Sequence, residues 1–176
     1  MRTGLGFAVL LAGLAAGSTE SIAASSSQLE LDGLAFSVAT DKHFYEVGEP
    51  IQVQLRWVNV SKKQLLIPVW NDTSMGATGT TRHDDGDRSR AFEVYGPEGK
   101  RLPYIGVIGC GPSSRWTLRP NESHDSRYSI TDSYDLSRPG TYLIRVTFVS
   151  YALPHISPDI WDGVLEHPDV QFEVHE

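Results

Sequence analysis

The chain has 176 residues, a formal net charge of −7 at pH 7, 40% hydrophobic residues and one cysteine. This acidity argues against nucleic acid and anionic membranes as partners, because both select basic protein surfaces. The lone cysteine excludes an intramolecular disulfide, so hydrophobic side chains have to stabilise the fold.

The first residues have the composition of a secretory signal peptide. Arg2 supplies a positive charge, residues 7–16 are mainly apolar, and small residues form a cleavage site that ends at Ala23 or Ala24. The apolar part is too short to anchor the chain in a bilayer, and no longer apolar run follows, so we expect no membrane span. We predict a secreted or periplasmic protein with a signal peptide at 1–23, a polar spacer at 24–33 and a single domain at 34–176.

Segments with the alternation of β-strands follow along the domain. In the clearest of them, 51–59, Val53, Leu55 and Trp57 alternate with polar residues, which is typical of a strand with one buried face. Residues 64–70 are mostly apolar and indicate a central strand that is buried on both faces. The other predicted strands are 34–40, 91–95, 101–107, 123–131, 141–151 and 170–175.

The connections between these strands contain typical turn residues. Gly96-Pro97-Glu98-Gly99 separates two predicted strands and indicates a hairpin. Pro139-Gly140 comes before a strand, and Tyr142 has the position of a tyrosine corner, in which the phenol bonds back to upstream backbone. Short strands without any helical periodicity predict an all-β protein, an Ig-like Greek-key β-sandwich of about seven to nine antiparallel strands.

Two connections are longer than hairpins require, and such loops are usually functional or disordered. Residues 71–90 are polar, whereas residues 152–169 combine prolines with large apolar side chains, among them Ile160 and Trp161. The apolar side chains of the second segment either pack back on the sandwich or face a partner. Trp161 is of particular interest, because amphipathic aromatic residues on loops are the usual interface anchors.

The residue patterns do not support catalysis or metal binding. The acidic run 83–87 lacks the spacing of an EF-hand, and no His-Glu-x-x-His motif is present. His124, Asp125 and Ser126 are neighbours at the start of a predicted strand, so their side chains alternate between faces and cannot converge as a triad. We therefore predict that the protein is not an enzyme and that it has no cofactor and no metal.

A glycine-containing loop is the second candidate contact region. Its backbone is open around Cys110, which has a glycine on either side, and glycine lets a backbone approach a partner closely. Cys110 is either a buried inert thiol or a reactive one that can pair between chains. The candidate protein-contact residues of the two regions are Ile105, Val107, Ile108, Ile160 and Trp161.

A series of short turn and strand motifs runs through most of the predicted domain. Its members are Gly48-Glu-Pro-Ile51, Asn59 with Ser61, Val69-Trp-Asn71, Phe92-Glu-Val94, Gly99-Lys100, Pro103-Tyr-Ile-Gly106, Leu118-Arg-Pro120, Glu122-Ser123, Tyr134-Asp-Leu-Ser137 and Pro139-Gly-Thr-Tyr142. In order and spacing, the series resembles the β-sandwich domain that precedes the catalytic domain in bacterial deuterolysin-like zinc endopeptidases, the aspzincins. It is also loosely similar to the bacterial intracellular proteinase-inhibitor sandwich.

The resemblance implies a sandwich fold and a habit of contacting proteases. The matching region contains no catalytic residue of that family, and no counterpart of the protease domain is present in the chain. We expect a secreted, non-catalytic module that binds a protein, with a secreted metallopeptidase as the partner and an inhibitory or prodomain-like role. A structural or envelope-associated module without a dedicated ligand is the alternative, and a small enzyme or metal carrier is a third hypothesis.

Overall fold

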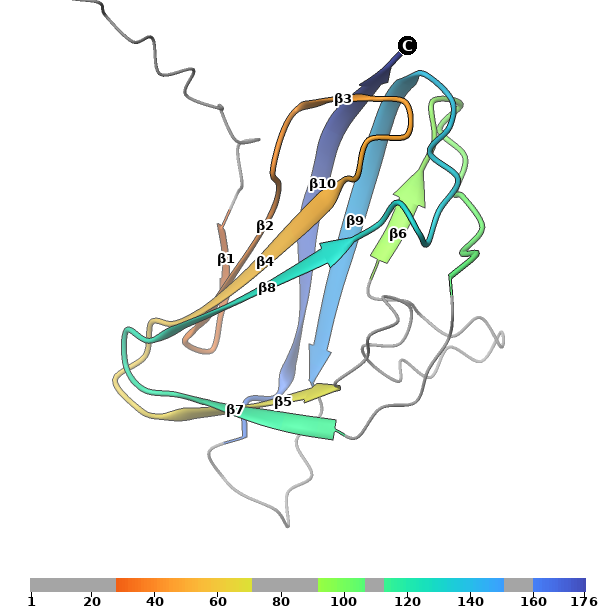
Figure 1. The fold of residues 1–176 in the computed structure, drawn as a ribbon. Coiled ribbons are helices and arrows are strands. Elements are labelled where there is room, and N and C mark those ends of the chain that lie inside the picture. The colour runs from red at the N-terminus through yellow and green to blue at the C-terminus, as the bar shows by residue number, and fades with distance from the viewer. Residues whose placement is uncertain (1–27, 71–91, 107–112, 151–159) are drawn as a thin grey trace, which may run out of the picture.

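A computed structural model describes residues 28–70, 92–106, 113–150 and 160–176 (Figure 1). All regular structure in these ranges is β-strand, which confirms the predicted all-β class, and they contain no helix that could cross a membrane. The strands are β1 (Gln28–Leu31), β2 (Leu34–Thr40), β3 (Phe44–Glu46), β4 (Gln52–Asn59), β5 (Leu65–Trp70), β6 (Phe92–Tyr95), β7 (Ser113–Leu118), β8 (Ser123–Ser129), β9 (Gly140–Ser150) and β10 (Gly163–His175).

These strands form three sheets. One four-stranded sheet has the order β1-β2-β4-β8, a second has the order β3-β10-β9-β6, and β5 pairs with β7. Pairing is antiparallel as predicted, except that β3 runs parallel to β10. The two four-stranded sheets face each other as the layers of a β-sandwich (Figure 1).

The core between the layers is built from alternate positions of the strands. In β4, Val53, Leu55 and Trp57 are buried and the residues between them are not, as the alternation predicted. The opposite layer contributes the buried positions of β9, and its Phe148 meets Phe36 of β2 with ring centroids 5.8 Å apart. Large side chains from both sheets therefore fill one shared core.

Asn59 is a fully buried residue at the end of β4, where the chain turns towards β5. Its Nδ2 donates to the carbonyl oxygens of Lys63 (2.7 Å) and Leu118 (2.8 Å). Its Oδ1 accepts from the backbone N–H (2.9 Å) and the hydroxyl (2.7 Å) of Ser61. Because Leu118 is the last residue of β7, the Asn59 side chain ties the β4–β5 corner to the β7–β8 corner.

Two buried tyrosines fix the turn that leads into β9. The Tyr142 hydroxyl donates to the carbonyl oxygen of Arg138 at 2.7 Å, which is the backbone bond expected of a tyrosine corner. The Tyr134 hydroxyl donates to the carbonyl oxygen of Phe92 at 2.8 Å. The first bond closes the turn on itself, and the second joins it to the start of β6.

The segment predicted as a polar spacer, 24–33, contains strand β1. Asp32 and Gly33 have φ angles of 48° and 79°, as in a two-residue hairpin turn, and they connect β1 to β2. Gly33 is needed because a Cβ atom at this position would lie 2.5 Å from the Cβ of Ser61. Strands β3 and β7 are likewise absent from the predicted set, since β3 has only three residues and β7 is mostly polar.

Two predicted strands differ in their surroundings. Residues 64–70 include β5, which belongs to the two-stranded sheet and not to the centre of a large one, and its Leu65 and Leu66 are only half-buried. In the described part of 101–107, the expected hairpin is reduced to one bridge between Tyr95 and Arg101. A short turn with few ladder bonds therefore replaces a full strand.

Strand β10 begins well before the predicted start at residue 170. It includes 163–169, which was predicted to belong to the proline-containing connection 152–169; one of these prolines, Pro168, lies within the strand. A shift of register between His167 and Val170 accommodates this proline, and the pairing with β9 continues on both sides. Because of this irregularity the first part of β10 could not be predicted from the sequence, although its Leu165 and Val170 are core residues.

We expect the substitution Asn59→Ala to lower the free energy of unfolding by about 3 kcal/mol, because it removes four hydrogen bonds and leaves the buried carbonyl oxygen of Leu118 without its side-chain donor. The measurement is urea unfolding followed by tryptophan fluorescence. Gln54→Ala, which removes an outward amide from the same strand, should change the value by less than about 0.5 kcal/mol. Equal losses for the two variants would contradict the role assigned to Asn59.

Tyr142→Phe tests the corner bond alone, since the ring is retained. The variant should lose about 1 kcal/mol of stability, the contribution of one hydrogen bond in a folded protein. Tyr95→Phe is the matched control, because the Tyr95 hydroxyl donates to the Glu93 carboxylate on the outer face of the sheet. Thermal unfolding should show a clearly larger decrease for Tyr142→Phe, and a stability equal to wild type would refute the corner.

Candidate functional site

We call the part of the sandwich around the described residues that border the ranges 71–91, 107–112 and 151–159 the loop side. In Figure 1 it includes the ends of β5 and β9 and the starts of β6 and β7, in the lower and right-hand parts of the picture. The border residues are Trp70, Phe92, Gly106, Ser113, Ser150 and Ile160.

Backbone pairing brings the borders at β5, β7, β9 and β10 together. Trp70 pairs with Ser113 in the β5–β7 ladder. The Ser150 hydroxyl donates to the carbonyl oxygen of Trp161 at 2.6 Å, and the Trp161 N–H donates to the carbonyl oxygen of Leu66 at 3.0 Å. The end of β9 and the start of β10 are therefore held against β5.

The other two borders meet through Tyr134. Its hydroxyl bonds to Phe92, and its ring lies 5.6 Å from the ring of Tyr104. The next residue, Ile105, donates its backbone N–H to the carbonyl oxygen of Ser133 at 2.9 Å. Phe92 pairs with Val146 of β9, four residues before the border at Ser150.

Ile105, a predicted contact residue, is an apolar side chain that is 62% exposed. Its backbone is fixed by the bond to Ser133 and by the packing of the adjacent Tyr104. Gly106 allows this arrangement, since a Cβ atom there would lie 2.6 Å from the Tyr104 hydroxyl and 3.0 Å from the Ser133 hydroxyl. Ile105 is thus an apolar group presented to solvent on a constrained backbone.

The structure corrects the prediction for Trp161. Its side chain is only 3% exposed and stacks on Phe148 at 5.5 Å, and its Nε1 donates to the carbonyl oxygen of Leu31 at 3.1 Å. The Trp161 side chain therefore packs back on the sandwich and does not face a partner, which were the two alternatives for residues 152–169. Ile160 is half-buried and bridges to Leu66.

The remaining candidates cannot be placed. Val107, Ile108 and Cys110 lie outside the described residues, as does the polar segment 71–90. Of the five predicted contact residues, Ile105 is therefore the exposed one among those that the structure describes.

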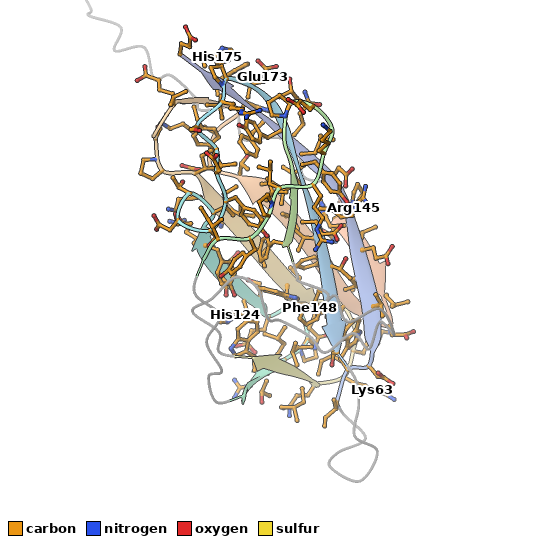
Figure 2. The ribbon with its side chains drawn as sticks, turned by 90° about the vertical axis from the view of Figure 1, so that its right-hand side faces the viewer. Lys63, His124, Arg145, Phe148, Glu173 and His175 are labelled. Carbon is orange, nitrogen blue, oxygen red and sulfur yellow. The ribbon has the colours of Figure 1, made fainter. Side chains whose placement is uncertain are left out.

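The edge strand β8 adds a polar group that the sequence analysis did not identify as a site. His124, Ser126 and Tyr128 are paired with core residues of β4, so they occupy core-facing positions, yet all three are only half-buried. The His124 ring stacks on Trp116 of β7 with centroids 3.5 Å apart (Figure 2). The signal was the polar character of alternate positions in 123–129, which is unusual for a core-facing strand.

These side chains do not form a catalytic triad. Ser126 Oγ lies 3.4 Å from His124 Nε2, but Asp125 lies between them in sequence and points to the other face. There its carboxylate is 3.6 Å from the guanidinium of Arg56. Desolvation lowers the pKa of His124 below its ordinary 6.5, and the charge of Asp125 opposes this effect.

Neither a metal site nor a known relative assigns chemistry to these residues. Among the described residues, no group of three or more His, Cys, Asp or Glu side chains is placed to hold a metal ion. No protein-family model matches the chain, and no curated protein is significantly similar to it. The resemblance to the aspzincin sandwich domain therefore stays a prediction.

The lowered pKa of His124 predicts a pH-dependent stability. Below pH 6.5 the unfolded chain binds a proton at this histidine more readily than the folded protein, so the free energy of unfolding should fall as the pH drops. His124→Gln should show a smaller decrease between pH 7.5 and pH 5, measured by urea unfolding at each pH. An identical pH dependence in the two proteins would contradict this assignment.

Proposed function

We propose that the chain is a secreted or periplasmic, non-catalytic β-sandwich that binds a protein through its loop side. The observation that carries this proposal is the 62% exposure of Ile105, next to the border residue Gly106, on a backbone that is bonded to Ser133. Loops on a rigid scaffold are common binding elements, because the scaffold fixes their ends and leaves their sequences free to vary.

The local geometry supports contact at Ile105. An exposed apolar side chain gains free energy when a partner removes it from water, by about 2 kcal/mol for a residue of this size. The backbone bond of Ile105 to Ser133 holds the main chain in place before binding, which reduces the entropy lost on association. Ile105 is therefore suited to be an anchor residue of an interface.

A secreted metallopeptidase is the partner that we propose. The support is the ordered series of motifs shared with the aspzincin sandwich domain, several of which form the corners described above. Asn59 and Ser61 make the buried amide corner, and Tyr142 makes the bond to Arg138. These residues shape the corners of the fold, so they support the resemblance at the level of the fold. They are not among the residues that we propose to contact the partner.

The test measures the residual activity of a zinc endopeptidase secreted by the same organism, after incubation with the protein without residues 1–23. We expect inhibition at micromolar concentration, and Ile105→Asp should raise the inhibition constant at least about tenfold, because it places a charge at the anchor. Val60→Asp is the control, since it adds the same charge at an exposed apolar residue just after β4.

Gel filtration of the mixture provides a second readout for complexes that form without inhibition. The absence of both inhibition and a complex at micromolar concentration would refute a peptidase partner and favour the structural module. Equal effects of Ile105→Asp and Val60→Asp would refute the loop side as the contact surface.

A further inference from the structure

A second exposed apolar group lies at the other end of the sandwich. Strand β3 presents Phe44, which is 61% exposed, and the next turn presents Val47, which is 43% exposed. Figure 2 shows this end at the top, where Glu173 and His175 of β10 are labelled, far from His124 and Phe148. The pairing of β3 with β10 places Phe44 beside Glu173 and Glu46 beside His175.

The outward position of Phe44 follows from the alternation of β3. Tyr45 points into the core, where its ring meets Phe172 at 5.7 Å, and its hydroxyl donates to Asp41 at 2.7 Å. Its neighbours Phe44 and Glu46 must therefore face solvent. The Phe44 ring contacts the ring of His175 on the neighbouring strand, with centroids 5.6 Å apart, and stays 61% exposed.

The surroundings of Phe44 are acidic. Glu46 is exposed, and the half-buried Glu173 has its carboxylate 3.3 Å from Nε2 of His175. The ring of His43 lies 6.2 Å from the Phe44 ring. Lys42 is a cation at this end, and it forms its ion pair with Glu49. An exposed aromatic ring with carboxylates beside it favours a cationic side chain, which can stack on the ring and bind the carboxylates at once.

The edge of β3 is closed to strand addition at Glu46. The Glu46 N–H donates to Oε2 of Glu49 at 3.1 Å, and the Glu46 carbonyl oxygen accepts from the Glu49 N–H at 2.9 Å. Both backbone groups of this residue are therefore engaged within the turn. A partner at this end therefore contacts side chains, because the N–H and C=O groups of Glu46 are not available for the addition of a strand.

We propose that Phe44, with Glu46 and Glu173 beside it, is a docking surface for a basic segment of a partner protein. An arginine or lysine of that segment lies over the Phe44 ring, and its charged group binds the carboxylates. A second copy of this chain is the wrong occupant, because two such acidic surfaces would repel each other when they meet.

The probe is a fluorescein-labelled octapeptide of alternating arginine and leucine, and the measurement is fluorescence anisotropy with the protein lacking residues 1–23. We expect saturable binding that weakens with added salt. Phe44→Ser and Glu173→Gln should each weaken it at least about fivefold, a typical loss at an anchor position. Glu166→Gln is the matched control, because it removes the same charge from an exposed position of the same strand.

Three results would overturn the proposal. They are the absence of binding at millimolar peptide, equal weakening by Glu173→Gln and Glu166→Gln, and a dimer in sedimentation velocity that Phe44→Ser abolishes. The last result would assign the surface to a second copy of the chain. Ile105→Asp should leave peptide binding unchanged, so failure at this surface is distinct from failure of the proposed loop-side function.

Discussion

The buried amide of Asn59 is the constraint on which the arrangement of the strands depends. Its two donors and two acceptor positions are satisfied only when the β4–β5 and β7–β8 corners are both formed. These corners direct β5 and β7 out of the four-stranded sheet and under the end of β9 and the start of β10 (Figure 1). The Asn59 side chain thus helps to determine where the loop side lies, because it fixes both corners. The apolar core determines how the two layers pack.

The alternation of buried and exposed positions along each strand then determines which side chains lie on the surface. On β3 the burial of Tyr45 forces Phe44 outward, so an exposed aromatic ring is a direct result of satisfying the core. On the edge strand β8 the core-facing positions need no complete burial, because no further strand follows it in the sheet within the described residues. Polar residues such as His124 and Ser126 are tolerated there, and the stack of His124 on Trp116 covers the flank of the core.

Strands with regular alternation could be predicted from the sequence, and strands that depend on distant partners could not. The core positions of β4 and β9 follow from their period of two, whereas β7 exists because it pairs with β5 from a remote part of the chain. The same limit applies to the site. Ile105 was predicted as a contact residue from its glycine-containing loop, and the structure shows that its side chain is exposed. The burial of Trp161 could not be predicted, because its side chain bonds to Leu31, in a segment that composition alone indicated as a spacer.

The two candidate surfaces differ in the physical basis of recognition. At the loop side, Ile105 is apolar and its contribution to binding should depend little on salt, because burial of apolar surface drives it. Around Phe44, carboxylates flank an aromatic ring, so attraction at this end should weaken as counterions screen the charges. The continuous strands β9 and β10 and the packed core separate these ends, and substitutions at distant sites act additively. Binding at either end can therefore be assigned by its response to salt as well as by substitution.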